Sequence, residues 1–179
     1  DTTLTITSAR NKSLTKTITV HVINPEIDSD VYVINRDTEG YEYITGMEIK
    51  TTIEDFLNNL KNEKETLKVY DASESSEIGG EEVIKTKYVV KLVINNTVYD
   101  ELILVLKGDI DGDGYVTVAD VTKTRNVVLR KATFDLYEKE AADIDVDSSI
   151  TVADVTKIRN CVLRKVSTLN DDLYAAING

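Results

Sequence analysis

Oxygen-bearing side chains recur at a fixed spacing in one Asp-rich segment. Counted from Asp109, they stand at positions 1, 3, 5, 9 and 12, as Asp109, Asp111, Asp113, Thr117 and Asp120. Gly114 stands at position 6, where a sharp turn needs backbone angles that side chains disfavour. Alternate carboxylates on so tight a turn converge on one point. Like charges held that close repel one another unless a cation lies between them.

This spacing indicates a calcium loop. Ca²⁺ takes about six to eight oxygen ligands, and the EF-hand loop supplies them at these positions, with a main-chain carbonyl from position 7. Position 7 is Tyr115. We therefore predict that residues 109–120, called the first loop below, bind Ca²⁺ through the five side chains above and the Tyr115 carbonyl.

The pattern returns 34 residues later. Residues 108–131 and 142–165 are identical at 17 of 24 aligned positions, and the shared residues are Asp-rich rather than apolar. Two copies are too few for a helical solenoid, and a duplication in register favours a ligand loop over a solvated turn. Residues 143–154, the second loop, are predicted to use Asp143, Asp145, Asp147, the Ser149 carbonyl, Thr151 and Asp154.

Two departures from the usual loop bear on these sites. Position 6 of the second loop is Ser148, so this loop must adopt a strained backbone or open slightly, and we expect a weaker or distorted second site. Position 12 is Asp in both loops, one methylene shorter than the usual bidentate Glu, which leaves its denticity open.

A helix is predicted after each loop, over 118–131 and 152–165. The apolar stripes that face the core are Val121, Thr124 and Val128, and Val155, Ile158 and Val162. The opposite faces repeat Lys123, Arg125, Asn126 and Arg130 as Lys157, Arg159, Asn160 and Arg164. They are either solvated or one binding face presented twice, and the duplication favours the second. Residues 102–106 before the first loop are typical of a strand, so the entering helix of a full EF-hand is missing there.

Upstream of the loops, the pattern predicts an α+β part. Residues 1–24 alternate as a hairpin around Arg10–Ser13, and Asn24-Pro25 marks a boundary. A helix capped by Thr51 or Thr52 places Ile53, Phe56, Leu57 and Leu60 on one face. Strands are predicted at 31–34 and 41–44 around the turn 37–40, and at 66–70, 83–95 and 97–107, with a loop at 73–80 and a tight turn at Asn95-Asn96.

Composition excludes several classes. The 179 residues carry a net charge of −11, which argues against binding a phosphate backbone, and no apolar run is long enough to span a membrane. No signal peptide is visible, and the chain begins as if cut from a longer one. Cys161 is the only cysteine and His21 the only histidine, so no disulfide framework, thiolate zinc site or nucleophile–base pair is expected. Cys161 is predicted to be a buried apolar residue.

The segments GDIDGDGYVTVADVTK and DIDVDSSITVADVTK resemble a type I-related dockerin module. The resemblance implies a calcium-bound module that plugs a secreted protein into a cohesin module, as in cellulosomes and similar cell-surface assemblies for carbohydrate degradation. It implies a partner face at Val118, Ala119, Arg125, Asn126 and Arg130, and again at Val152, Ala153, Arg159, Asn160 and Arg164. The near-identity of the faces is similar to that of dockerins that bind in two orientations.

The resulting expectation is an α+β chain in three parts. Residues 1–27 resemble the closing strands of an Ig-like domain, 28–107 resemble the X-type module that often precedes a dockerin, and 108–179 form an all-α dockerin with two Ca²⁺ sites. We expect a non-catalytic, extracellular or cell-surface adaptor, monomeric alone, that binds neither nucleic acid nor membrane. A calcium-stiffened stalk of an adhesin is the main alternative. An EF-hand sensor and an enzyme are less favoured.

Overall fold

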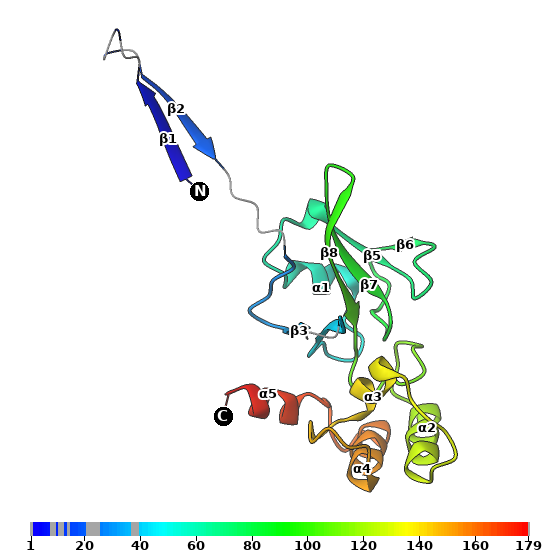
Figure 1. Ribbon diagram of the computed structural model, residues 1–179. Helices are drawn as coiled ribbons and strands as arrows, with labels where there is room; N and C mark the ends of the chain where they lie inside the picture. Colours follow the sequence, from blue (N-terminus) through cyan, green and yellow to red (C-terminus); the bar gives the residue numbers. More distant parts are fainter. Residues whose placement is uncertain are drawn as a thin grey trace.

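The computed structural model describes residues 2–7, 10, 13, 15–20, 26–36 and 40–178 (Figure 1). Strands β1 (Thr2–Thr7) and β2 (Thr15–Val20) pair antiparallel in a sheet of their own, which confirms the predicted hairpin. Asn11 and Lys12 of its turn, His21, the Asn24-Pro25 boundary and residues 37–39 of the next turn lie outside the described residues.

A six-stranded mixed sheet follows, in the order β3-β4-β8-β7-β5-β6. Every pair in it is antiparallel except β4 with β8. Its strands are β3 (Val33–Arg36), β4 (Glu42–Thr45), β5 (Leu67–Tyr70), β6 (Glu77–Ile78), β7 (Val89–Ile94) and β8 (Thr97–Leu104). Helix α1 (Ile53–Asn58) and a 3₁₀ turn, η1 (Lys64–Thr66), lie between β4 and β5.

The predicted face of α1 is the buried one. Thr52 caps the helix by accepting a hydrogen bond from the Asp55 N–H, and Ile53 and Phe56 are fully buried. Leu60 is also buried, although the helix ends before it. These side chains form one core with residues of the sheet such as Ile44, Leu92 and Leu104.

Two of the predicted boundaries in the sheet are wrong. Residues 83–95 do not form one strand: β7 begins at Val89, and Lys87 takes a left-handed φ of 74° that breaks the extended backbone. The segment before it leaves the sheet and lies against the first loop. Residues 73–80 are not all loop, because β6 pairs there with β5. The turn at Asn95-Asn96 is confirmed, with φ of 50° and 63° at its two residues.

The C-terminal part is helical, and its helices are α2 (Val118–Val128), α3 (Leu136–Ala142), α4 (Val152–Val162) and α5 (Asp171–Asn178). Helices α2 and α4 pack against each other (Figure 1). A second core is built from Val105, Ile110, Ala141, Ile144 and Ile158 with their neighbours. Leu104 belongs to the first core and Val105 to the second, so no linker separates the two parts. The α+β fold is thus confirmed.

The two long helices are shorter than predicted. They end at Val128 and Val162, because Arg130 and Arg164 adopt left-handed φ angles of 58° and 55°. The N–H groups of Arg130 and Lys131 return to the carbonyls of Val127 and Asn126, the pattern of a left-handed helix cap. Within the described part of the chain, no helix has the length and apolar character that crossing a membrane requires.

Candidate metal centres and partner-binding faces

Asp109 opens the first loop from a fully buried position, 0% exposed. Its Oδ2 atom accepts a hydrogen bond from the main-chain N–H of Thr86 at 2.9 Å. Its Oδ1 atom is buried and has no hydrogen-bond partner among the described residues. A buried carboxylate oxygen without a donor is costly unless a cation or a proton satisfies it.

Asp120 closes the first loop and lies in the first turn of α2. One carboxylate oxygen accepts from the Thr117 N–H at 2.8 Å, while the Thr117 side chain accepts from the Ala119 N–H at 3.1 Å, as part of a capping box. The other oxygen accepts from the N–H groups of Ile110 at 2.8 Å and Asp111 at 3.2 Å. This one side chain therefore ties the end of the loop to its beginning and starts the helix.

The first loop brings three of its predicted ligands together. Oxygens of Asp109, Asp111 and Asp120 all lie within 4.8 Å of one another. Asp113 lies exposed outside this group, and its carboxylate accepts from the Tyr115 N–H at 2.8 Å. The Thr117 hydroxyl donates a hydrogen bond to Oδ2 of Asp120, at 3.3 Å, and so contacts one member of the group. The ring of Tyr115 is exposed, which suits a residue that would offer only its main-chain carbonyl.

The second loop groups a different set. Here oxygens of Asp143, Asp145 and Asp147 lie within 4.8 Å of one another. The Asp143 carboxylate accepts from the N–H groups of Asp147 at 3.2 Å and Ser148 at 2.9 Å. The Asp145 Oδ1 atom is buried without a hydrogen-bond partner among the described residues, as Oδ1 of Asp109 is in the first loop.

Asp154 ties the second loop to α4 as Asp120 ties the first loop to α2. It accepts from the N–H groups of Thr151 at 2.9 Å and Ile144 at 2.8 Å, and Thr151 caps the helix. Asp154 is 0% exposed but lies outside the group of three. Ser149 is exposed and donates its N–H to Asp147 at 2.8 Å.

Removal from water shifts the acidity of these carboxyls. Burial, together with the nearby charges of Asp120 and Asp113, raises the pKa of Asp109 to about 6. Burial also raises the pKa values of Asp120, Asp143 and Asp145. Each loop therefore holds oxygens whose negative charge is costly until a positive charge joins them. The all-oxygen donor sets, with one orphaned buried oxygen each, fit a hard cation such as Ca²⁺.

The backbone bends in the same way in both loops, with different residues. Gly112 and Gly114 have φ of 75° and 88° in the first loop, and Val146 and Ser148 have φ of 59° and 68° in the second. The strained backbone predicted at Ser148 is thus present. The strain at Val146 was missed, although aligning the repeats places it opposite Gly112. A β-branched residue rarely adopts this conformation.

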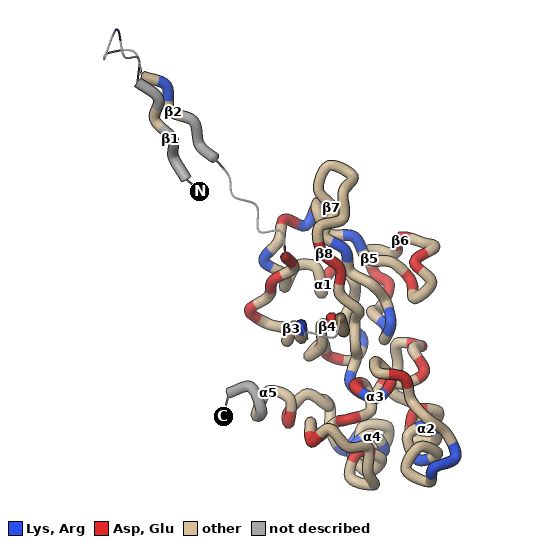
Figure 2. Tube along the Cα trace, in the orientation of Figure 1, with Lys and Arg blue, Asp and Glu red and all other residues tan. Residues whose placement is uncertain are grey.

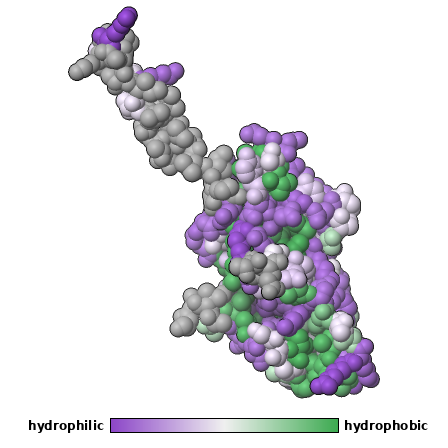
Figure 3. Space-filling model, in the orientation of Figure 1, coloured by the Kyte–Doolittle hydropathy of each residue, from purple (hydrophilic) through white to green (hydrophobic). Residues whose placement is uncertain are grey.

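The two helix faces predicted for a partner are exposed to a similar degree. Val118 is 67% exposed and its counterpart Val152 is 66%. The arginines and alanines are exposed on both faces, and Asn126 and Asn160 are half-buried. Arg130 and Arg164 lie at the caps rather than within the helices. Sequence reasoning missed Leu129 and Leu163, which are 47% and 50% exposed. Figure 3 shows apolar side chains gathered over the helical part.

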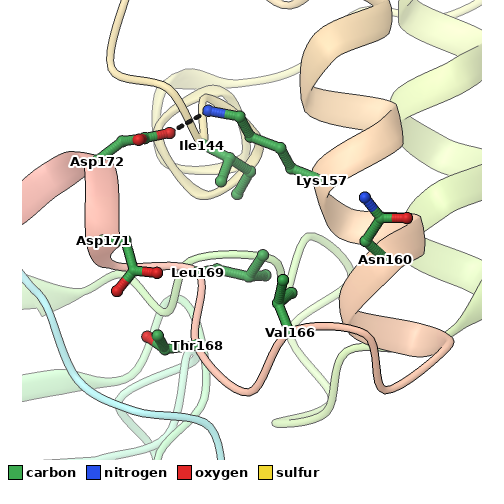
Figure 4. A pocket seen from close by; sticks show the side chains of 8 residues that line it. All are labelled: Ile144, Lys157, Asn160, Val166, Thr168, Leu169, Asp171 and Asp172. Atoms are coloured by element: carbon green, nitrogen blue, oxygen red, sulfur yellow. Dashed lines mark hydrogen bonds and ion pairs between the residues drawn. The ribbon is translucent and has the colours of Figure 1, made fainter.

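The surroundings of the two faces differ at one lysine. Lys123 of α2 donates to the Ile110 carbonyl at 3.3 Å, within the first repeat. Its counterpart Lys157 of α4 instead pairs with Asp172 of α5 (Figure 4). The C-terminal segment therefore lies beside α4, and a groove of about 210 Å³ lined by Lys157, Asn160 and Asp172 separates them. Asn160 of the second face therefore lies at the edge of this groove, next to the C-terminal segment.

Cys161 fits the predicted packing role. It is half-buried against the second core, and burial raises the pKa of its thiol. A thiol with a raised pKa is a poor nucleophile near neutral pH.

Comparisons with known proteins identify a family for the loop–helix part of the chain. Residues 107–163 match the family model described as the dockerin type I domain. In the solved complex of the third ScaC cohesin with a mutated ScaB dockerin from Acetivibrio cellulolyticus, one chain is 35% identical. The alignment covers 36% of this chain and 90% of that one, with a TM-score of 0.34. No curated protein matches. With its two EF-hand-like loops, the chain belongs to the type I dockerin family through residues 107–163.

Proposed function

We propose that this chain is a non-catalytic, calcium-dependent adaptor that binds a cohesin module. The pair of matched, exposed helix faces on a duplicated loop–helix unit carries the proposal, because a surface kept twice is more than a solvated helix requires. A related dockerin is bound to a cohesin. Such binding would attach the parent protein to an extracellular or cell-surface complex.

Calcium would organise both faces. In the first loop the ligands would be Asp109, Asp111, Asp113, the Tyr115 carbonyl, Thr117 and Asp120. In the second they would be Asp143, Asp145, Asp147, the Ser149 carbonyl, Thr151 and Asp154. The bound ion would neutralise carboxylates that burial and mutual repulsion now disfavour. Because Asp120 and Asp154 also lie in the first turns of α2 and α4, the ligand set would orient the helices that carry the faces.

The matching exposed faces of α2 and α4 support binding of a cohesin in two orientations. Val118, Ala119, Arg125, Asn126 and Arg130 would meet the cohesin in one orientation, and Val152, Ala153, Arg159, Asn160 and Arg164 in the other. The two sets have the same residues, matching exposure and equivalent places on packed helices. A cohesin seated on either face would then find the same arrangement of side chains.

The test compares three variants of the full chain for cohesin binding, with calcium and with EDTA. Replacing Arg125 and Asn126 by Ala should weaken binding by only about twofold, because two equal orientations contribute equally to the association constant. Replacing Arg159 and Asn160 is the matched control and should do the same. The variant that combines all four substitutions should bind the cohesin about 30-fold more weakly or worse, which is the effect of removing central contacts at an interface.

Two results would overturn parts of this proposal. A large loss from one double variant alone would mean a single orientation. Calcium binding without capture of any cohesin would remove the adaptor function and favour the stalk of a surface adhesin.

The preceding parts would support the dockerin. We propose residues 28–107 as an X-type module that stabilises it, and residues 1–27 as the closing strands of an Ig-like domain. Buried Lys107 supports the first assignment, because its Nζ donates to the carbonyls of Glu140 and Asp143 at 2.8 Å each. Lys87 adds an ion pair with Asp135 at 2.6 Å.

A further inference from the structure

We propose that residues 83–87, which belong to the sheet part, complete the first calcium loop by positioning Asp109. Calcium in the first loop would then be coupled to the packing of residues 83–87, while the second loop meets the preceding module through Lys107 instead. The inference rests on the proposed calcium binding and adds a positioning segment that lies outside the dockerin match.

The segment reaches the first ligand directly. The Thr86 N–H donates to Oδ2 of Asp109 at 2.9 Å, across 23 residues of sequence, and both residues are buried. The Thr86 hydroxyl accepts from the Leu106 N–H at 3.1 Å, which fixes the segment to the chain entering the loop. An N–H donor to a carboxylate in a buried site is a strong, directional contact. It holds Oδ2, while Oδ1 has no hydrogen-bond partner of good geometry among the described residues.

The glycines of the first loop carry independent evidence. A Cβ atom at Gly112 would lie 3.2 Å from the Thr86 carbonyl oxygen. A Cβ atom at Gly114 would lie 3.0 Å from Cγ of Lys85 and 3.1 Å from Cγ2 of Val83. Backbone shape alone does not require glycine at these positions, because the second loop places side chains there at similar φ angles. The close approach of residues 83–86 disfavours a side chain at both positions, because the contacted atoms would have to shift by a few tenths of an ångström.

The second loop lacks this support. The helix α3 ends at Ala142, directly before Asp143, and the Asp143 carboxylate accepts hydrogen bonds from Asp147 and Ser148 of its own loop. Helix α3 therefore leads into the second loop, whereas residues 83–87 pack against the start of the first loop. Since coupling between two sites is reciprocal, the segment raises the affinity of the first loop, and the ion strengthens the packing of the segment.

The first loop can be observed separately from the second. Tb³⁺ replaces Ca²⁺ in oxygen-ligand sites and emits when a nearby tyrosine is excited. Tyr115 lies within the first loop, and the second loop has Ser149 at the same position. The emission that is lost in Tyr115→Phe therefore reports the first loop, and Ca²⁺ calorimetry on the full chain counts both sites.

The experiment compares Thr86→Pro with Thr86→Val in the full chain. Proline removes the N–H donor, whereas valine keeps it and removes only the hydroxyl. We expect Thr86→Pro to weaken the first loop by about tenfold more than Thr86→Val does, with the second loop unchanged within about twofold. Equal affinities of the two variants for the first loop would overturn the coupling. If the unchanged chain binds neither ion, the calcium proposal itself fails.

A second comparison stands if Thr86→Pro does not fold. Gly114→Ser gives the first loop the residue that the second loop already has, and should weaken the first loop. The same change in a Val83→Ala, Lys85→Ala background should recover at least half of the loss in logarithmic affinity, because the contacted side chains are gone. Identical losses in both backgrounds would show that contact with the Val83 and Lys85 side chains is not the cause, and would contradict this part of the proposal. Ser148→Gly is the matched control and should leave the first loop unaffected.

Discussion

The first loop begins beneath residues 83–87 of the sheet part, whereas the second loop begins at the end of α3. Their sequences are nearly the same, yet Asp109 receives a donor from a distant segment and Asp143 is held by its own loop. The C-terminal segment packs beside α4, through Lys157 and Asp172. Duplicated sequences therefore acquire different properties from their surroundings. Figure 2 shows acidic residues gathered around α3, between the sheet part and the helices α2 and α4.

The largest effect is expected at Lys107, which anchors the second repeat to the sheet part. This lysine is 1% exposed, and its Nζ donates to Oε1 of Glu140 at 2.7 Å and to two carbonyls. Lys107→Met should lower the free energy of unfolding by about 3–5 kcal/mol, because a carboxylate and two carbonyls lose their donor. Denaturant titration in calcium measures it.

Lys123→Met is the control for this change. Lys123 is half-exposed and its ion pair with Glu138 is 3.6 Å long, so the loss should stay below about 1 kcal/mol. Similar losses for the two lysines would contradict the anchoring role of Lys107.

The next effect concerns the acidity of the first loop in EDTA. Folded Asp109 has a pKa of about 6, against an ordinary value of 3.8. Between these values the folded state binds more protons, so the free energy of unfolding should fall as the pH rises from about 4 to 7. The contribution of this group is on the order of 3 kcal/mol. Thermal unfolding across this range measures it.

Substitution separates this contribution from those of other groups. Asp109→Asn should flatten the pH dependence in EDTA more than Asp143→Asn does, because Asp109 is the more completely buried carboxyl. In saturating calcium the slope should reverse, since protons compete with the ion below about pH 6. An unchanged slope in Asp109→Asn would rule out Asp109 as the source.

A smaller loss is expected where the C-terminal segment meets the sheet part. Asn170 is 2% exposed and its Nδ2 donates to the Met47 carbonyl at 3.1 Å. Asn170→Ala should cost about 2 kcal/mol, because it leaves a buried carbonyl without its donor. Tyr174→Phe removes one half-buried hydroxyl bond to the Gly46 carbonyl and should cost less. Calorimetric unfolding of both variants tests the order, and a larger loss for Tyr174→Phe would contradict it.

The smallest effect tests the backbone of the second loop. Val146→Gly should stabilise the protein by about 1 kcal/mol by relieving a left-handed β-branched residue. The mirror change, Gly112→Val, should destabilise by more than this, because the new side chain would also meet the Thr86 carbonyl. Equal and opposite effects would mean that the two loops are supported alike. Denaturant midpoints compare the two changes.

Local features of this chain were predictable from sequence because they depend on neighbours. The repeat, the cap of α1 at Thr52, the turn at Asn95-Asn96 and the buried face of α1 all follow from short-range spacing. Periodicity could not place the start of β7. Residues 83–88 have strand character, but Lys87 turns the backbone and the segment packs elsewhere.

The candidate site divides in the same way. Sequence alone predicted which oxygens each loop would offer and determined that two similar helices follow, since ligand spacing and helical period are local properties. The structure brings three carboxylates of each loop together. Only the tertiary structure decided that the Thr86 N–H donates to Asp109 and that Lys107 donates to the Asp143 carbonyl of the second loop. It also decided that Lys157 forms an ion pair with Asp172. These contacts join residues far apart in the chain. The contacts of Thr86 and Lys107 lie where the two cores meet, and burial there strengthens each hydrogen bond relative to its strength in water.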